Sequence, residues 1–372
     1  FLTHHVGAAR LRAAIIDHKL REGSGADARK AEDIADAAGV EAHVLELIWA
    51  DSANRAHEAA RALRYAALCQ AARKLGARVI ATGHTRDDQA ETVFLRASRS
   101  SGLRGLAGMA AFAPAPSWPD GRGLWLARPL LRTRRNELRD FLATRRAAWI
   151  EDPANENEIH ARVRARRALA ELEREGLDPM RFASFAERLR PHVDEIDRRA
   201  AALIDDAAAF DADEVVFDRS RWRGDETVRQ RALDVLITAA SGAERGAPPS
   251  QLENLSEALD RSDFRGATLA GAWLQPRGGR IVIARDPGAL AGRADGAAPV
   301  PPLRLAPSAE AVWDGRVLLR TDEPGWSVVF NGRSPELQRG EERRPLAAAS
   351  PHWLLRERVQ HLLGGINTGK SR

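Results

Sequence analysis

The chain has 372 residues, enough for roughly two or three domains that each bury a core. Its composition, 44% hydrophobic and 29% charged, is that of an ordinary soluble protein, and no apolar run approaches the roughly eighteen residues of a membrane span. The single cysteine, Cys69, excludes an intrachain disulfide and a cysteine-based metal cluster. We therefore expect a cytoplasmic protein with no membrane partner.

The first part of the chain alternates between short apolar runs and segments with helical spacing. Strands are predicted at residues 12–17, 40–47 and 77–82, and helices at 27–38, 54–75 and 86–97. Strands separated by helices of this length imply right-handed crossovers and a parallel sheet that is covered on both faces. The predicted fold class is therefore α/β with a doubly wound parallel sheet.

The rest of the chain is predicted to be mainly helical at first and then mostly β. After a loop rich in Pro, Gly and Trp, helices are expected at 133–147, 158–173, from the 180s to 210, at 225–240 and at 249–260. A hairpin over 268–284 is expected to turn at Gly278-Gly279, and a polar tail follows a small β segment near 311–330. The predicted domains are 1–148 (α/β), 149–285 (mainly helical, substrate-binding, ending in the hairpin), a linker over 286–310, and a small C-terminal segment, 311–372.

Two polar loops follow predicted strands, where ligands bind in doubly wound folds. One contains Asp17, His18, Lys19 and Arg21, and the other runs from Gly83 to Thr92. In the second loop, Thr85 and Asp88 have the spacing of a capping box, so a helix cap is one interpretation. The adjacent acids Asp87 and Asp88 also suit a magnesium ion, or a proton taken from an amine nucleophile.

Five segments carry a resemblance to a known family. They are IIDHKLREGSGADARKAEDIADAAGV, EAARALRYAAL, ATGHTRDDQAETVFLRASRSSGLRGLAGM, ARPLLRTRRNELRDFL and WIEDPANENEIHARVRARRAL. In this order they resemble the tRNA isoleucine-lysidine synthetases, which belong to the N-type ATP pyrophosphatases, also called the PP-loop superfamily. The likeness covers roughly residues 14–169, and TLAGAWLQPRGGRIVIARDP resembles a downstream region of the same family.

The resemblance implies an enzyme that uses ATP and Mg²⁺ to adenylate the wobble cytidine of the isoleucine tRNA with a CAU anticodon. The ε-amine of L-lysine then displaces AMP and gives lysidine. The catalytic candidates are Asp87, Asp88 and His84, with Asp88 also the candidate magnesium ligand; the nucleotide-binding candidates are Asp17, His18, Arg21 and Gly83. For His18 and His84, a structural role in their loops remains an equal alternative.

The family's phosphate-binding loop, Ser-Gly-Gly-x-Asp-Ser, occurs nowhere in this chain. Since the chain opens with Phe1 and Asp17 already follows the family's second strand, we expect the loop upstream of the present sequence and little activity from this chain alone. Two alternatives stay open: an inactive RNA-binding protein of the same fold, and another tRNA-modifying enzyme of the PP-loop superfamily. Related tRNA-thiolating enzymes use a pair of cysteines, which argues against that reaction here.

Arginine clusters indicate where RNA binds. Of the 57 cationic residues only four are lysine, so arginine abundance alone is weak evidence and its distribution matters more. Seven arginines fall between 128 and 146 and four between 162 and 167, which predicts a polyanion surface rather than merely solvated helix faces. The sequence also leaves open whether two copies of the chain form a homodimer. The predicted RNA-binding residues are Arg132, Arg134, Arg135, Arg162, Arg164 and Arg166.

Overall fold

The computed structural model describes residues 2–19, 23–48, 57–99, 101–150, 161–292 and 298–366. The chain forms two compact units, residues 1–193 and 194–372, and each has its own buried clusters of hydrophobic side chains. No helix within the described ranges combines the length and apolar character needed to cross a membrane. The boundaries expected at 148, 285 and 310 remain predictions about domains.

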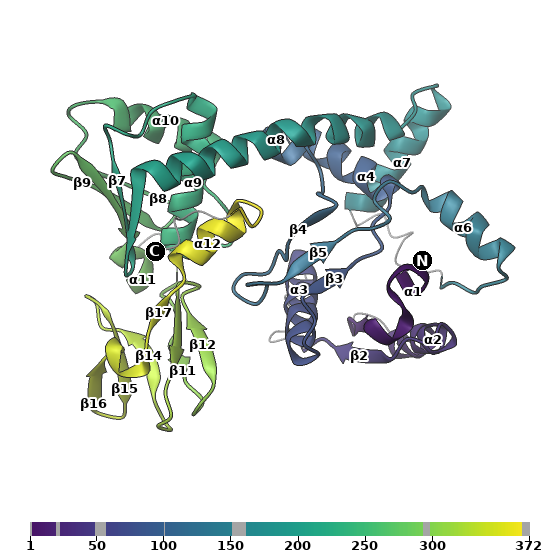
Figure 1. Ribbon diagram of the computed structural model, residues 1–372, viewed down its shortest axis with the longest axis horizontal. Coiled ribbons are helices and arrows are strands. Elements are labelled where there is room, and N and C mark those ends of the chain that lie inside the picture. Colours follow the sequence, from purple (N-terminus) through teal and green to yellow (C-terminus); the bar gives the residue numbers. More distant parts are fainter. Residues whose placement is uncertain are drawn as a thin grey trace. The chain divides into compact units, whose positions relative to one another are not determined.

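In the first unit, strands alternate with helices, as the periodicity predicts (Figure 1). β1 and β2 pair in parallel, with Ala13 opposite Ala42 and Asp17 opposite Glu46. β3 and β5 are also parallel, and β4 is added antiparallel to β5. The α/β class with a parallel sheet is confirmed. The elements are α1 (Leu2–Val6), η1 (Ala8–Arg10), β1 (Ala13–Asp17), α2 (Ser24–Ala37), β2 (Ala42–Glu46), α3 (His57–Lys74), β3 (Val79–Ala81), α4 (Arg86–Ala97), α5 (Leu103–Leu106), β4 (Phe112–Pro114) and β5 (Trp125–Ala127).

The parallel strands lie in two separate hydrogen-bonded sheets, β1-β2 and β3-β5-β4. Among the described strands, β1 pairs only with β2, and β3 pairs only with β5. Val79 of β3 is 48% exposed, although parallel strands are normally covered on both faces. Helix α3 packs against both β1 and β3, so the two unpaired strand edges belong to the same α/β layer.

Three further helices follow the sheets: α6 (Arg135–Thr144), α7 (Ala161–Arg174) and α8 (Met180–Ala207). α4 packs against α7, and Ala90, Leu169, Met180 and Ala183 form a small buried cluster between α4, α7 and the start of α8. The cluster holds the polar first turn of α4 beside α7, which matters for the candidate site. The predicted start of α7, residues 158–160, lies outside the described residues.

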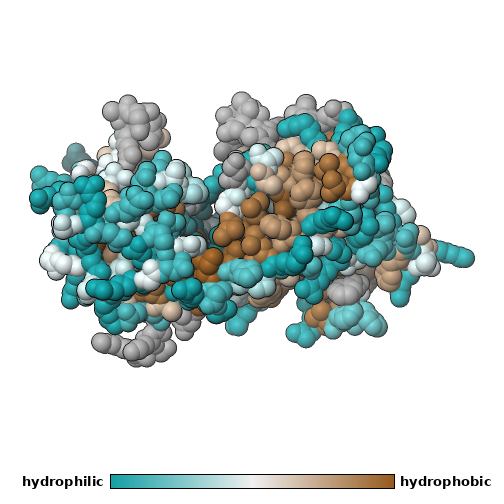
Figure 2. Space-filling view, turned by 90° about the horizontal axis from the view of Figure 1, so that it is seen from above, coloured by the Kyte–Doolittle hydropathy of each residue, from teal (hydrophilic) through white to brown (hydrophobic). Residues whose placement is uncertain are grey.

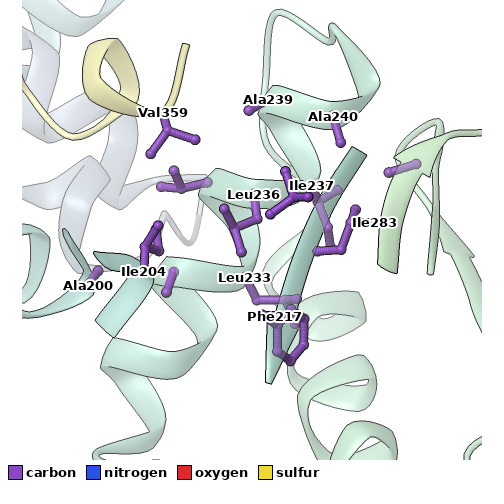
Figure 3. Close-up of a cluster of buried hydrophobic side chains, with 14 of the residues drawn as sticks. Ala200, Ile204, Phe217, Leu233, Leu236, Ile237, Ala239, Ala240, Ile283 and Val359 are labelled. Carbon is purple, nitrogen blue, oxygen red and sulfur yellow. The ribbon is translucent and has the colours of Figure 1, made fainter. Parts of the chain in front are cut away.

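The second unit contains a five-stranded sheet of order β6-β7-β10-β9-β8 with α9 packed on it. Leu233, Leu236 and Ile237 of α9 lie among the strand residues Phe217 and Ile283 in a fully buried core (Figure 3). The predicted hairpin is confirmed: β9 and β10 are joined at Gly278-Gly279, both with positive φ. The elements are β6 (Ala208–Asp211), β7 (Glu214–Asp218), α9 (Glu226–Ser241), α10 (Pro249–Asp260), β8 (Ala267–Leu269), β9 (Ala272–Arg277) and β10 (Arg280–Arg285).

The C-terminal part has more structure than a linker and a polar tail. The expected linker contains the short helix α11, and the expected tail forms three strands, a 3₁₀ turn and α12, which packs on α9. Trp313 and Trp326 are buried in its core. Charged residues alternate with apolar ones in these strands, so a hydropathy pattern does not predict them. The elements are α11 (Pro287–Ala291), β11 (Leu303–Arg304), β12 (Glu310–Trp313), β13 (Val317–Arg320), β14 (Ser327–Phe330), β15 (Pro335–Arg339), β16 (Glu342–Pro345), η3 (Leu346–Ala349), β17 (His352–Trp353) and α12 (Leu355–Leu362).

Seen from above, the surface is mostly hydrophilic, and hydrophobic residues gather in patches between the charged ones (Figure 2). Several large apolar side chains of the first unit are well exposed, among them Ile48 at 87%, Phe112 at 54% and Leu103 at 52%. Scattered exposed apolar residues are normal in proteins, so we attach no function to them individually.

Candidate active site

Four of the predicted residues, Gly83, His84, Asp87 and Asp88, lie in the loop after β3 and in the first turn of α4. Thr85 caps α4: its hydroxyl accepts the backbone N–H of Asp88 at 3.3 Å, and its own N–H donates to Asp88 Oδ2 at 2.8 Å. This is the capping box that the spacing predicts. Asp88 is thus part of the helix start, in addition to any chemical role.

Asp87 and Asp88 both contact Arg135, the first residue of α6. Asp87 Oδ2 accepts the backbone N–H of Arg135 at 2.8 Å, and Asp88 Oδ1 accepts from its guanidinium at 3.1 Å. Burial raises the pKa of Asp88, but hydrogen bonds from Thr85 and the charge of Arg135 outweigh it and hold the pKa below its ordinary value. Asp88 is therefore a carboxylate at neutral pH, and a poor proton acceptor.

His84 lies in the same loop and is neutral at physiological pH. Burial and the charge of Arg128 lower its pKa to about 4, and the charge of Asp88 offsets only part of their effect. Its Nδ1 lies 2.8 Å from the hydroxyl of Thr82, which orients the ring. A neutral imidazole can donate or accept one hydrogen bond here, but it does not attract an anionic substrate by charge.

At the ends of β1 and β2 lies a group of three charged side chains. Lys19 Nζ is 3.3 Å from Asp17 Oδ2 and 2.8 Å from Glu46 Oε1. Burial raises the pKa of Asp17, but hydrogen bonds from Ser24 and Lys19 lower it overall, whereas hydrogen bonds to Glu46 and Asp17 raise the pKa of Lys19. Asp17 and Lys19 are therefore both charged at neutral pH.

The other predicted nucleotide contacts are less well defined. Gly83 is exposed, and a Cβ at this position would meet no atom within 4 Å, so a ligand has free access to its backbone. His18 is half-buried beside Asp17. Arg21 lies outside the described residues. The structure thus brings Gly83, His84, Asp87 and Asp88 together in one loop.

Most of the predicted RNA-binding arginines form ion pairs within the first unit. Arg132 pairs with Glu187 at 2.9 Å, Arg134 with Glu173 at 3.9 Å and Arg135 with Asp88 at 3.1 Å. Arg166 Nε pairs with Glu91 Oε1 at 2.9 Å. Arg162 has no such carboxylate partner among the described side chains, and Arg164 is exposed on α7. These ion pairs reduce the charge that the paired arginines offer to RNA.

Sequence reasoning passed over Glu91. It is 2% exposed on α4, and its Oε2 has no hydrogen-bond partner among the described residues. A buried carboxylate with one free oxygen is costly unless a cation binds there. One signal was present in the sequence: Glu91 lies between the apolar residues Ala90 and Val93 of the predicted helix.

The comparisons identify the class to which this α/β fold belongs, the PP-loop proteins. Residues 2–173 match the family model described as a PP-loop domain. The tRNA(Ile)-lysidine synthase of Caulobacter vibrioides is 36% identical over 342 residues, covering 91% of this chain and 74% of that protein. That of Hyphomonas neptunium is 35% identical and covers 78% of each chain. The chain belongs to the tRNA(Ile)-lysidine synthase family.

Among solved structures, the U34-tRNA thiolase NcsA from Methanococcus maripaludis with its [4Fe-4S] cluster is similar at a TM-score of 0.40 and 15% identity. It covers 49% of this chain and 63% of its own, too weak a likeness for any conclusion. Because the PP-loop match begins at residue 2, it leaves the expected upstream phosphate loop unconfirmed.

Proposed function

We propose that this protein makes lysidine. It uses ATP to adenylate the oxygen at the 2-position of the wobble cytidine, in the isoleucine tRNA with a CAU anticodon. It then joins L-lysine to the 2-position carbon, and AMP leaves. The observation that carries the proposal is the similarity to tRNA(Ile)-lysidine synthases along 91% of the chain. A cytoplasmic location, where lysine, ATP and tRNA occur together, is part of the proposal.

The two steps need different groups. Adenylation turns a poor leaving oxygen into a good one, and the lysine amine then attacks and releases AMP. The attacking amine must be neutral, while the α-ammonium and carboxylate of lysine need charged partners. Glu91 supports this chemistry best, since its free oxygen is buried in α4 close to the loop of His84 and Asp88. We assign it the binding of a lysine ammonium.

The phosphates of ATP need a loop of backbone N–H groups, which the family supplies with Ser-Gly-Gly-x-Asp-Ser. That motif is absent from this sequence, and β1 and β3 each have one edge without a strand partner among the described residues. We propose that one more parallel strand, carrying this loop, pairs with both edges. The exposed Val79 on β3 would then be covered, as is usual in a parallel sheet.

A magnesium site at Asp88 is not supported by its surroundings. Both carboxylate oxygens already accept hydrogen bonds, from Thr85 and from Arg135. No group of three or more His, Cys, Asp or Glu side chains suited to a metal ion occurs among the described residues. Mg²⁺ bound mainly through ATP phosphates would need few protein ligands, so we derive no step from a protein-bound metal.

A thiolation reaction, as in another branch of the PP-loop superfamily, is disfavoured by Cys69. The thiol is fully buried among Tyr65, Ala72 and Leu126. Burial raises its pKa to about 11, so the nucleophilic thiolate is scarce at neutral pH. A sulfur carrier needs the opposite environment.

The test is lysine incorporation into the isoleucine tRNA in the presence of ATP. We would compare the present chain with a version in which an apolar strand and Ser-Gly-Gly-x-Asp-Ser are joined by a crossover to β1. The proposal predicts strong incorporation by the extended version, little by the present chain, and none when the wobble cytidine is replaced by uridine. Tight tRNA binding without incorporation by either version would favour the inactive RNA-binding alternative.

A further inference from the structure

Five arginines from five separate segments of the first unit lie close enough to repel one another, and three of them, Arg61, Arg128 and Arg162, also interact with His84. The five are Arg61 of α3, Arg96 of α4, Arg128 after β5, Arg162 of α7 and Arg190 of α8, and we call them the arginine cluster. Burial lowers the pKa of the Arg96 guanidinium, and the charges of the other four lower it further. Like charges are therefore concentrated here at a cost in folding free energy.

Three members of the cluster are held rigidly on one loop. Arg96, Arg128 and Arg190 donate to backbone carbonyls within residues 105–110, at 2.6 to 3.1 Å. Gln89 fixes the same loop, because its side chain both donates to and accepts from the backbone of Met109, at 2.9 and 2.8 Å. The guanidiniums are thus positioned before any ligand arrives.

Two buried side chains at the cluster, Tyr65 and Arg128, carry polar atoms that the described residues leave unsatisfied. Tyr65 is 2% exposed; its hydroxyl interacts with the guanidiniums of Arg61 and Arg128, but no hydrogen bond of regular geometry to a described residue satisfies it. Arg61 stacks on its ring, 5.0 Å from the centroid, and Arg128, itself 8% exposed, leaves its Nε without an acceptor. Buried donors of this kind are uncommon and each needs an explanation.

The arginine cluster also differs from other arginines nearby, because described carboxylates do not neutralise most of its charge. Arg132, Arg135 and Arg166 each pair with a carboxylate. Arg61, Arg96, Arg128 and Arg162 pair with no carboxylate whose placement the structure describes. The positive charge still available to a ligand therefore lies in the cluster and not in the paired arginines.

We propose that the arginine cluster and Tyr65 bind a phosphate group, a phosphodiester of the RNA strand next to the base that reacts. The inference rests on the proposed function for the identity of the RNA. A phosphate has oxygens enough for Arg128 Nε, the Tyr65 hydroxyl and guanidinium N–H groups of Arg61 and Arg162, and hydrogen bonds from guanidinium to phosphate are among the strong ones. His84 adjoins both the cluster and Asp88, so a phosphate here would fix the strand beside the α4 loop.

The first test needs no RNA. Arg61→Gln and Arg162→Gln remove charge without breaking the hydrogen bonds to loop 105–110, and Arg174→Gln, an exposed arginine paired with Glu171 on α7, is the control. Inorganic phosphate raises the Tm of many proteins slightly by exclusion, and the control measures that baseline. We expect a larger phosphate-induced rise for the wild type and the control, and at most the baseline for the two cluster variants.

The second test separates the two sources of phosphate, RNA and ATP. For the isoleucine tRNA, each cluster variant should bind about tenfold more weakly, and the slope of log K against log salt should fall by about one unit. Lower ATP affinity with unchanged tRNA binding would assign the phosphate to the nucleotide instead. If phosphate, tRNA and ATP all behave as in Arg174→Gln, the inference is wrong.

A wild-type chain that binds no tRNA would disprove the proposed function but not the phosphate site, which the Tm test then decides alone. Conversely, the cluster variants could form lysidine normally and show the same phosphate-induced rise in Tm as Arg174→Gln. That result would support the proposed function and disprove the phosphate site.

Discussion

Asp88 and Arg135 join the first turns of α4 and α6, with Oδ1 and Nη2 3.1 Å apart across 47 positions of sequence. The same carboxylate closes the capping box with Thr85 through its other oxygen. One side chain thus organises the loop of the candidate active site, and its removal should affect folding as well as chemistry.

For this reason we expect Asp88→Ala to lower the free energy of unfolding by about 1–3 kcal/mol, from a lost cap and a half-buried ion pair. Asp87→Asn keeps an acceptor for the Arg135 N–H and should change it by less than about 0.5 kcal/mol. Urea unfolding of the two variants provides the comparison. Equal stability would mean that Asp88 acts in chemistry alone.

His84 should make stability depend on pH. Its pKa, about 4 when folded, is near 6.5 when unfolded, so the unfolded chain binds more protons between these values and stability falls as pH drops from about 6.5 to 4. At pH 4 the loss is about 3 kcal/mol, as an upper bound. Urea unfolding of the wild type and His84→Gln at pH 7.5, 5.5 and 4.5 measures it. The two curves should converge or cross toward low pH, and parallel curves would contradict the buried, neutral imidazole.

Glu91→Gln should weaken lysine binding at least tenfold, because the amide keeps an acceptor for Arg166 but loses the charge that an ammonium needs. Calorimetric titration of L-lysine into the chain measures this. Glu171→Gln, a charge removed from an exposed site on α7, is the control and should bind lysine normally. Unchanged lysine affinity in Glu91→Gln would leave Glu91 as a purely structural partner of Arg166.

In the second unit, Asp314 lies between two buried guanidiniums, 3.0 Å from Arg285 and 2.7 Å from Arg316. Asp314→Ala should cost about 3–5 kcal/mol, since both charges stay buried without their carboxylate. Asp322→Ala removes a largely exposed partner of Arg320, 3.9 Å away, and should cost under about 1 kcal/mol. Thermal unfolding of the two variants distinguishes these cases, and similar Tm values would show that the buried group adds nothing.

The sequence by itself determined the features that depend on neighbouring residues. Thr85-x-x-Asp88 predicted the start of α4, glycines with positive φ ended α2 and α3 at Gly39 and Gly76, and Gly278-Gly279 predicted the hairpin. Backbone preferences and caps act within a few residues, so they can be read along the chain. The family resemblance likewise rests on local motifs.

Only the tertiary structure decided which charges meet. Arg166 reaches Glu91 across 75 positions, and Arg135 reaches Asp88 across 47, whereas Arg61 and Arg128 stay without a described carboxylate. Nothing in the sequence distinguishes the paired arginines from the unpaired ones. Ion pairing depends on distances of a few ångströms that packing sets between remote segments, and no local pattern encodes them. The free charge available to RNA was therefore decided by the packing of α3, α4, α7 and α8.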